Sequence, residues 1–107
     1  MTNQEFNIIA DDQINMCLNL LIAKDKEYNN AQIDRFHTFE VAAKLLNCTK
    51  KQALAGMMIK HTVSIYDMCR DGNWTEEQWT EKITDSINYL LLLKAMVVED
   101  NHKNDVL

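Results

Sequence analysis

The chain contains no proline and only two glycines among its 107 residues. Proline breaks the interior of a helix and glycine weakens it, so long helices can run through this sequence without interruption. Tight β-turns, which depend on the same two residues, are correspondingly scarce. Apolar residues recur at three- and four-residue steps, the period of one helix face; near the N-terminus they are Ala10, Ile14, Cys17, Leu18 and Leu21. The sequence therefore predicts an all-α fold.

Helix start and stop signals divide the chain into four predicted helices in a single domain of residues 1–107, arranged as a four-helix bundle. The expected ranges are residues 5–26, 34–46, 50–70 and 75–99, followed by a frayed tail at 100–107. Thr49 and Thr75 are each followed three residues later by glutamine, the capping-box pattern of a helix N-terminus. Gly72 is expected to end the third helix in the left-handed conformation. Four apolar side chains of the second helix are expected to point inward: Phe36, Phe39, Ala43 and Leu46.

Charge and cysteine content narrow the class of protein. The net charge is −5 and there is no basic run, which argues against a protein that binds nucleic-acid backbones. A locally basic pocket for a small anion remains compatible with this charge. Three cysteines without C-x-x-C spacing are typical of small buried hydrophobes in a reducing compartment: Cys17, Cys48 and Cys69. The polar start of the chain and its short apolar runs predict a soluble cytoplasmic protein that does not enter a membrane.

The third and fourth predicted helices are apolar around most of their circumference, with narrow polar stripes. On the third helix the stripe consists of Gly56, Lys60, Ser64 and Asp67, between an inner apolar face and a second one of Ile59, Val63 and Tyr66. On the fourth helix the stripe consists of Glu81, Asp85 and Asn88, followed by the leucine run 90–93. Four consecutive leucines cover every side of a helix, so this half is expected to be buried all round. A chain of this length has few places for such burial unless subunits pack together.

Two interpretations of the stripes are open. They are either the solvated faces of an ordinary bundle, or they face each other, or a partner subunit, around a polar cleft. His61, Ser64 and Asp67 carry the letters of a catalytic triad, but rigid neighbours on one helix do not form a linear relay. His61 lies with the apolar face and is expected to be partly buried. Three carboxylates from the two helices, Asp67, Glu81 and Asp85, are candidate ligands for Mg²⁺.

Four motifs occur in order: K-E-Y-N at 26–29, R-F-x-x-F at 35–39, M-x-K-H-x-x-S-I at 58–65 and E-K-I-x-D-x-I-N-Y-L at 81–90. Together they resemble small phage and prophage proteins related to MazG, in the all-α nucleotide pyrophosphohydrolase superfamily. The resemblance covers residues 18–99. It implies a helical bundle, assembly as a homo-oligomer (dimer or tetramer), and Mg²⁺-dependent hydrolysis of nucleoside triphosphates to monophosphate and pyrophosphate.

The resemblance also assigns roles to residues. Asp85 matches the last carboxylate of the family's second metal pair, and Glu81 stands where an additional glutamate is common. The first pair, E-x-x-E, is missing, because the third helix offers Lys60, His61, Ser64 and Asp67 instead. Lysine and serine in place of two carboxylates weaken cation binding and suit direct contact with phosphate oxygens.

Three functions follow as expectations. The first is a nucleotide pyrophosphohydrolase acting on (d)NTP-type nucleotides, with Lys60 and Asp85 catalytic and Mg²⁺ held by Glu81, Asp85 and Asp67. The second is a non-catalytic module that sequesters a cyclic or signalling nucleotide, in the host cytoplasm if the chain is phage-encoded. The expected ligand-binding residues are Lys24, Tyr28, Arg35, Lys60, His61, Ser64 and Asn88. The third is a structural helical oligomer without a ligand.

Overall fold

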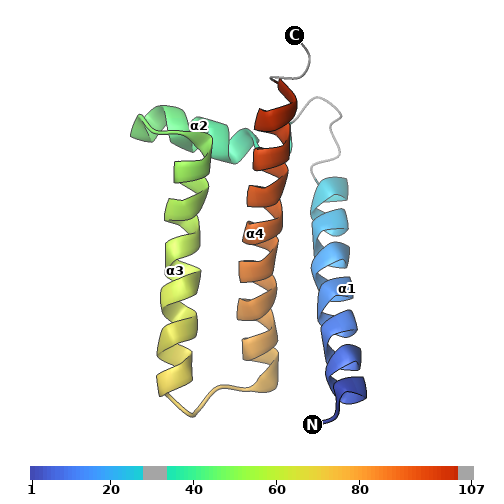
Figure 1. The fold of residues 1–107 in the computed structure, drawn as a ribbon. Coiled ribbons are helices and arrows are strands. Elements are labelled where there is room, and N and C mark those ends of the chain that lie inside the picture. Colours follow the sequence, from blue (N-terminus) through green and yellow to red (C-terminus); the bar gives the residue numbers. More distant parts are fainter. Residues whose placement is uncertain (28–33, 104–107) are drawn as a thin grey trace.

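The computed structural model describes residues 1–27 and 34–103, and every regular element within them is helical. Figure 1 shows the helices in chain order: α1 (Asn3–Glu27), α2 (His37–Leu46), α3 (Lys50–Arg70) and α4 (Glu76–Lys103). The predicted all-α fold is confirmed, and α3 has the predicted bounds. α4 continues to Lys103, so residues 100–103, predicted to belong to a frayed tail, are helical.

Both predicted capping boxes are present. The Thr49 hydroxyl accepts from the Gln52 amide at 3.1 Å, and the Thr49 amide donates to the Gln52 side chain at 2.9 Å. Thr75 and Gln78 make the same pair of bonds at 3.1 and 3.0 Å. A further box joins Thr2 and Glu5 before α1, at 3.1 and 2.8 Å, and was not predicted although the pattern is in the sequence. These reciprocal hydrogen bonds provide acceptors for backbone amides that have no partner within the first turn of a helix.

The helix C-termini differ from the prediction. Neither glycine of the described residues has a positive φ, so the left-handed cap predicted at Gly72 is wrong. The cap of α3 is instead Asp71, which has an extended conformation. The Asp71 amide donates a hydrogen bond to the Asp67 carbonyl. The left-handed cap occurs at Asn47, with φ 54°, where its amide closes the last turn of α2 on Lys44. Asparagine tolerates this conformation better than other non-glycine residues, which permits a sharp corner before α3.

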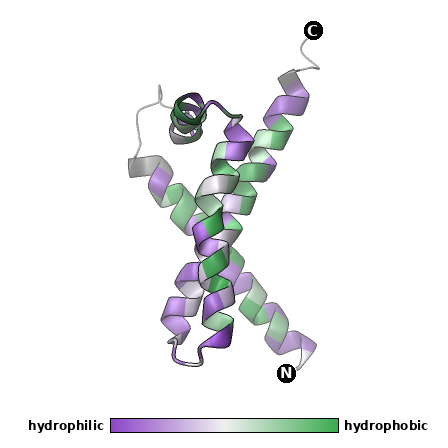
Figure 2. Ribbon diagram, turned by 90° about the vertical axis from the view of Figure 1, so that its left-hand side faces the viewer, coloured by the Kyte–Doolittle hydropathy of each residue, from purple (hydrophilic) through white to green (hydrophobic). Residues whose placement is uncertain are grey.

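Three long helices lie side by side, with α4 between α1 and α3, and α2 crosses one end of α3 (Figure 1). α3 runs antiparallel to α4, and Figure 2 shows α1 crossing behind them at an angle. The predicted compact four-helix bundle is therefore not closed within one copy of the chain. The radius of gyration is 16.4 Å, against about 13 Å expected for a compact domain of this length.

The buried core is small and lies where α2, α3 and α4 meet. It consists of Phe36, Phe39, Leu54 and Met96, with Met57, Tyr89, Leu92 and Leu93 packed against it. Leu46 was predicted to point inward but is exposed, because it is the last residue of α2 and that end of the helix extends past α3 (Figure 1). Of the cysteines, Cys17 is buried, Cys48 is half-buried and Cys69 is exposed, so the prediction of burial fails for Cys69.

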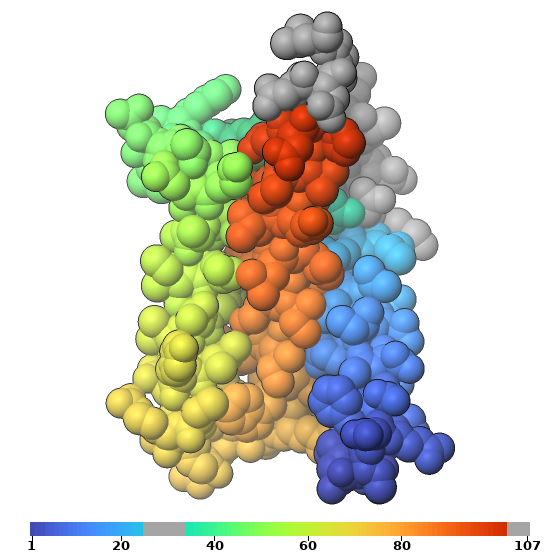
Figure 3. Space-filling model, in the orientation of Figure 1, coloured from blue at the N-terminus to red at the C-terminus, as the bar shows by residue number. Residues whose placement is uncertain are grey.

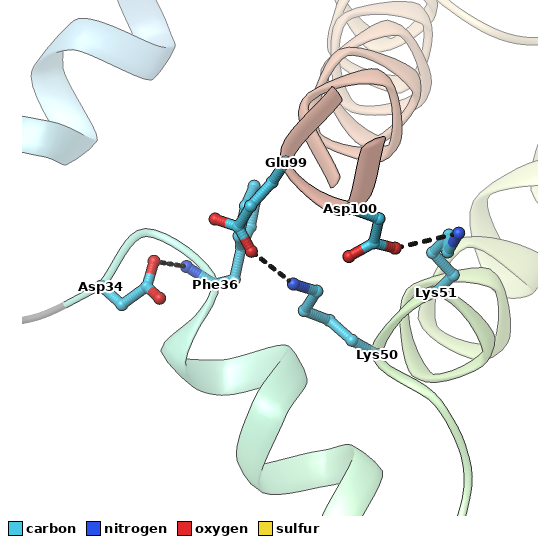
Figure 4. A network of polar contacts seen from close by, with 6 residues as sticks. All are labelled: Asp34, Phe36, Lys50, Lys51, Glu99 and Asp100. Carbon is cyan, nitrogen blue, oxygen red and sulfur yellow. Dashed lines mark hydrogen bonds and ion pairs between the residues drawn. The ribbon is translucent and has the colours of Figure 1, made fainter. Parts of the chain in front are cut away.

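Two ion pairs connect the start of α3 to the end of α4 (Figure 4). Lys50 Nζ lies 2.8 Å from Glu99 Oε1, and Lys51 Nζ lies 3.0 Å from Asp100 Oδ2. The Lys50 ammonium also lies 5.0 Å from the centre of the Phe36 ring. The hydrogen bond to Glu99 is the main cause that raises the pKa of Lys50. This ammonium therefore stabilises the junction while it stays charged.

Much apolar surface is uncovered. Leu92 and Leu93 pack against the core, but Leu90 and Leu91 are exposed, so the predicted all-round burial of the leucine run is not found in one copy. The chain exposes 8415 Å², whereas a globular monomer of its mass exposes roughly 6200 Å². On the face that Figure 3 shows, the three long helices lie side by side and no other helix covers them. Among the described residues, no helix combines the length and hydropathy that crossing a membrane requires.

Candidate functional site

A polar and aromatic cluster lies between the middle of α3 and the middle of α4. His61 Nδ1 is 3.9 Å from Asp85 Oδ2, and the His61 ring centre is 5.2 Å from that of Tyr89. Tyr89 in turn meets Phe39 edge to face at 6.5 Å, which attaches the cluster to the core. The His61 side chain is largely buried. The predicted partly buried histidine is therefore confirmed, and its neighbours come from α4.

Buried polar atoms without hydrogen-bond partners distinguish this part of the molecule. Three buried side-chain atoms have no hydrogen-bond partner among the described residues: His61 Nδ1, Ser86 Oγ and Asn88 Oδ1. Asn88 as a whole is 7% exposed. The distance from His61 Nδ1 to Asp85 is too long for a hydrogen bond. An unpaired buried acceptor costs about 1–3 kcal/mol. Folded proteins contain few such groups, so their presence beside Asp85 marks a candidate site.

Thr84, one turn before Asn88 on α4, shows how a buried polar side chain is satisfied elsewhere in the chain. Thr84 accepts a hydrogen bond from Gln13 Nε2 at 2.7 Å and donates one to the Thr80 carbonyl at 2.6 Å. Gln13 on α1 thus connects that helix to α4, a role that the sequence analysis missed. Its position between Ala10 and Cys17 on the buried side of α1 was the available signal. With its bonds complete, Thr84 serves the fold, whereas Asn88 Oδ1 has no such partner among the described residues.

The polar stripe of α3 is only partly associated with the cluster. Lys60 is exposed, and Ser64 is half-buried one turn further along α3. Asp67 is exposed and pairs with Arg70 of its own helix at 3.0 Å. Because His61 Nδ1 has no hydrogen-bond partner, the relay of a Ser-His-Asp triad is not formed.

The three candidate metal ligands do not come together within one copy. No group of three His, Cys, Asp or Glu side chains is placed to hold a metal ion among the residues that the structure describes. Glu81 lines an open depression with Met16, Glu76, Glu77 and Thr80, one helical turn before Asp85. Asp67 lies on α3, where it pairs with Arg70 of the same helix. A hard cation needs several oxygen ligands at once, so one copy offers at most Glu81 and Asp85.

The remaining predicted ligand contacts are spread over other places. Lys24 is exposed near the end of α1. Arg35 donates from Nη1 to the Leu21 carbonyl at 3.3 Å, so it contacts the last turns of α1. Tyr28 lies outside the described residues. The structure therefore brings His61 and Asp85 of the predicted set together across α3 and α4. Asn88 lies on α4, about one turn after Asp85.

No protein family, curated protein or solved structure matches the chain.

Proposed function

We propose that the chain is a nucleotide-binding protein, and that its ligand contacts the cluster of His61, Asp85 and Asn88 between α3 and α4. The observation that supports this proposal is the group of three buried, unpaired polar atoms near Asp85: His61 Nδ1, Ser86 Oγ and Asn88 Oδ1. His61, Asp85 and Asn88 also belong to the motifs through which the chain resembles the nucleotide pyrophosphohydrolases. Both lines of reasoning lead to the same turn of α4.

The residue chemistry suggests how a nucleotide is held. Asp85 and Asn88 present hydrogen-bond acceptors, which suit ribose hydroxyls or the amino group of a base. Lys60, exposed next to His61 in the chain, supplies a positive charge for a phosphate. We favour binding without hydrolysis, because the three carboxylates are not gathered in one copy.

Hydrolysis is the second candidate, favoured by the spacing of Glu81 and Asp85. One turn apart on α4, these carboxylates would hold Mg²⁺, which would activate a water molecule. Lys60 would then neutralise charge that develops on the phosphates. We place either function in the cytoplasm, the host cytoplasm if the chain is phage-encoded.

We also propose that the functional form is a homo-oligomer, a dimer or a tetramer, in which the leucine run of α4 contacts another copy. The excess of about 2000 Å² of surface over a globular monomer supports this. Leu90, Leu91 and Val98 lie exposed on that helix. Leu91→Asp is expected to reduce the oligomer mass. An unchanged mass and melting temperature would contradict this contact.

The binding proposal is tested by a thermal-shift screen against NTPs, dNTPs and cyclic mono- and dinucleotides, with Mg²⁺ and again with EDTA. A ligand at 100 times its Kd stabilises by about 2.7 kcal/mol, which is readily seen as a rise in Tm. A shift that survives EDTA is expected for binding alone. A shift that needs Mg²⁺, together with pyrophosphate release, would favour the hydrolase instead.

Matched variants locate the site. Lys60→Ala and Asp85→Asn are expected to abolish the shift while leaving the Tm of the free protein nearly unchanged, since both side chains are at least partly exposed. Lys94→Ala, on the exposed side of α4, is the control and should bind normally. No shift with any nucleotide in wild-type protein would refute the proposal.

A further inference from the structure

The side of the molecule formed by α2 and α3 carries an apolar surface that lies away from α4 and from the candidate site. Its centre is the outward stripe of α3, where Ile59, Val63 and Tyr66 follow one another at steps of four and three residues. All three are more than half exposed, and Tyr66 is 72% exposed. Figure 1 shows the C-terminal end of α2 extending past the start of α3, on the side away from α4. That end carries Leu45 and Leu46, the former 81% exposed.

We propose that this α2–α3 surface binds the same surface of a second copy of the chain, with the two α3 helices antiparallel around a two-fold axis near Val63. The contact is distinct from the one through the leucine run of α4. It goes beyond the proposed function, because it requires neither a nucleotide nor the His61 cluster.

The area of the surface fits a dimer contact. A fully exposed side chain of this kind presents roughly 200 Å², so the five apolar residues expose on the order of 600 Å² together. A stable interface buries about 800 Å² per partner, with a polar rim completing the apolar centre. Gln52 and Arg70, both exposed, bound the stripe at its two ends and provide such a rim. An apolar patch of this size lies at the upper end of what the largest patch of a typical monomer exposes, about 300–600 Å².

The order of residues along the stripe favours self-association. In an isologous contact each copy supplies the same surface, so residues equidistant from the axis face each other. The middle of the stripe falls between Thr62 and Val63, which places Ile59 of one copy opposite Tyr66 of the other. Gly56, beside the stripe, is exposed and borders open space, because a Cβ at this position would meet no atom within 4 Å. A heterologous partner would not require this symmetric spacing.

Val63→Glu tests the contact, because a two-fold axis would bring two buried carboxylates together. We expect native mass spectrometry or light scattering to give half the wild-type mass, while the helical circular dichroism is retained. Asn19→Glu, which adds the same charge to the exposed side of α1, is the control and should keep the wild-type mass. If both proposed contacts exist, the wild-type mass is four times the chain mass of 12.5 kDa.

A second variant keeps the test independent of folding defects. Val63→Cys in a Cys69→Ser background should form a disulfide-linked pair of chains when oxidised by glutathione disulfide, because the axis places both thiols together. A wild-type monomer, an unchanged mass for Val63→Glu, or an oligomeric Val63→Cys protein that does not cross-link would each overturn the inference. If the mass falls for Leu91→Asp but not for Val63→Glu, the α4 contact stands and this one fails.

Discussion

Replacing Asn88 by leucine should stabilise the protein, although it removes a polar side chain from the candidate site. Asn88 is 7% exposed and its Oδ1 has no hydrogen-bond partner among the described residues. Removing an unpaired buried acceptor relieves a cost of about 1–3 kcal/mol. Leucine has the same branched shape but is larger than asparagine, so it adds apolar contact while overpacking takes back part of the gain. We expect a net stabilisation of about 1–2 kcal/mol.

Urea unfolding at fixed protein concentration measures this change, with an m-value equal to that of wild type. In thermal unfolding the gain corresponds to a rise of about 5–15 °C. The same variant should lose the nucleotide-induced shift, because the amide is proposed to bind the ligand. A gain in stability with a loss of binding is the usual consequence of removing a functional polar group.

Thr84→Val is the matched control, one turn earlier on the same helix and also buried. Its hydroxyl has two short hydrogen bonds, to Gln13 and to the Thr80 carbonyl. Thr84→Val removes both bonds and leaves the Gln13 side chain without this partner at the α1–α4 contact, so it should destabilise the folded protein by about 1–2 kcal/mol. The two substitutions should therefore change the free energy of unfolding in opposite directions. If Asn88→Leu instead destabilises by more than about 1 kcal/mol, the Asn88 amide is bonded in the folded protein and the argument for the site is wrong.

Three further predictions concern the fold. The pKa of Lys50 is raised in the folded state, so its charged side chain stabilises the fold fully below its unfolded pKa of about 10.4. This stabilisation is lost as the pH rises through the folded-state pKa. The Tm difference between wild type and Lys50→Met should therefore shrink above about pH 10.4. Met96→Ala, at a fully buried core position, should cost about 2–5 kcal/mol in urea unfolding, whereas exposed Val97→Ala should cost less than about 0.5 kcal/mol. Asn47→Ala, at a positive φ, should destabilise the protein by about 1 kcal/mol. Gly72→Ala, where φ is not positive, should be neutral or stabilising by up to about 1 kcal/mol. A higher melting temperature for Asn47→Ala than for Gly72→Ala would contradict the observed caps.

Local signals in the sequence predicted the helices well, because capping boxes and apolar periodicity act within a few residues. Thr49 and Gln52 begin α3 as expected for that reason. The end of α2 at residue 46 was predicted, but the place of the left-handed cap was not. Asparagine and glycine can each adopt that conformation, and the chain does so at Asn47, after α2, and not at Gly72, after α3. The exposure of Leu46 depends on how far α2 extends past α3, which a helical wheel cannot represent.

The candidate site was predictable only within each helix. Spacing on α3 placed His61 with the apolar face, and spacing on α4 grouped Asp85 with Asn88. The pairing of His61 with Asp85 depends on how α3 is rotated and shifted against α4, which the spacing on one helix does not determine. Whether Asp67 and Glu81 approach each other depends on the same alignment, and within one copy they do not form a metal-binding group.

The attachment of α1 has a consequence for the order in which the chain folds. α2, α3 and α4 follow one another in sequence and pack as neighbours, whereas Gln13 reaches Thr84 across 71 residues. Closing so long a loop costs more entropy than forming the nearby contacts, so α1 docks after the other three helices have assembled. It should also be the first to detach in the native state, and its amides should exchange hydrogen faster than those in the middle of α3. Equal protection of α1 and α3 would mean that the four helices fold as one cooperative unit.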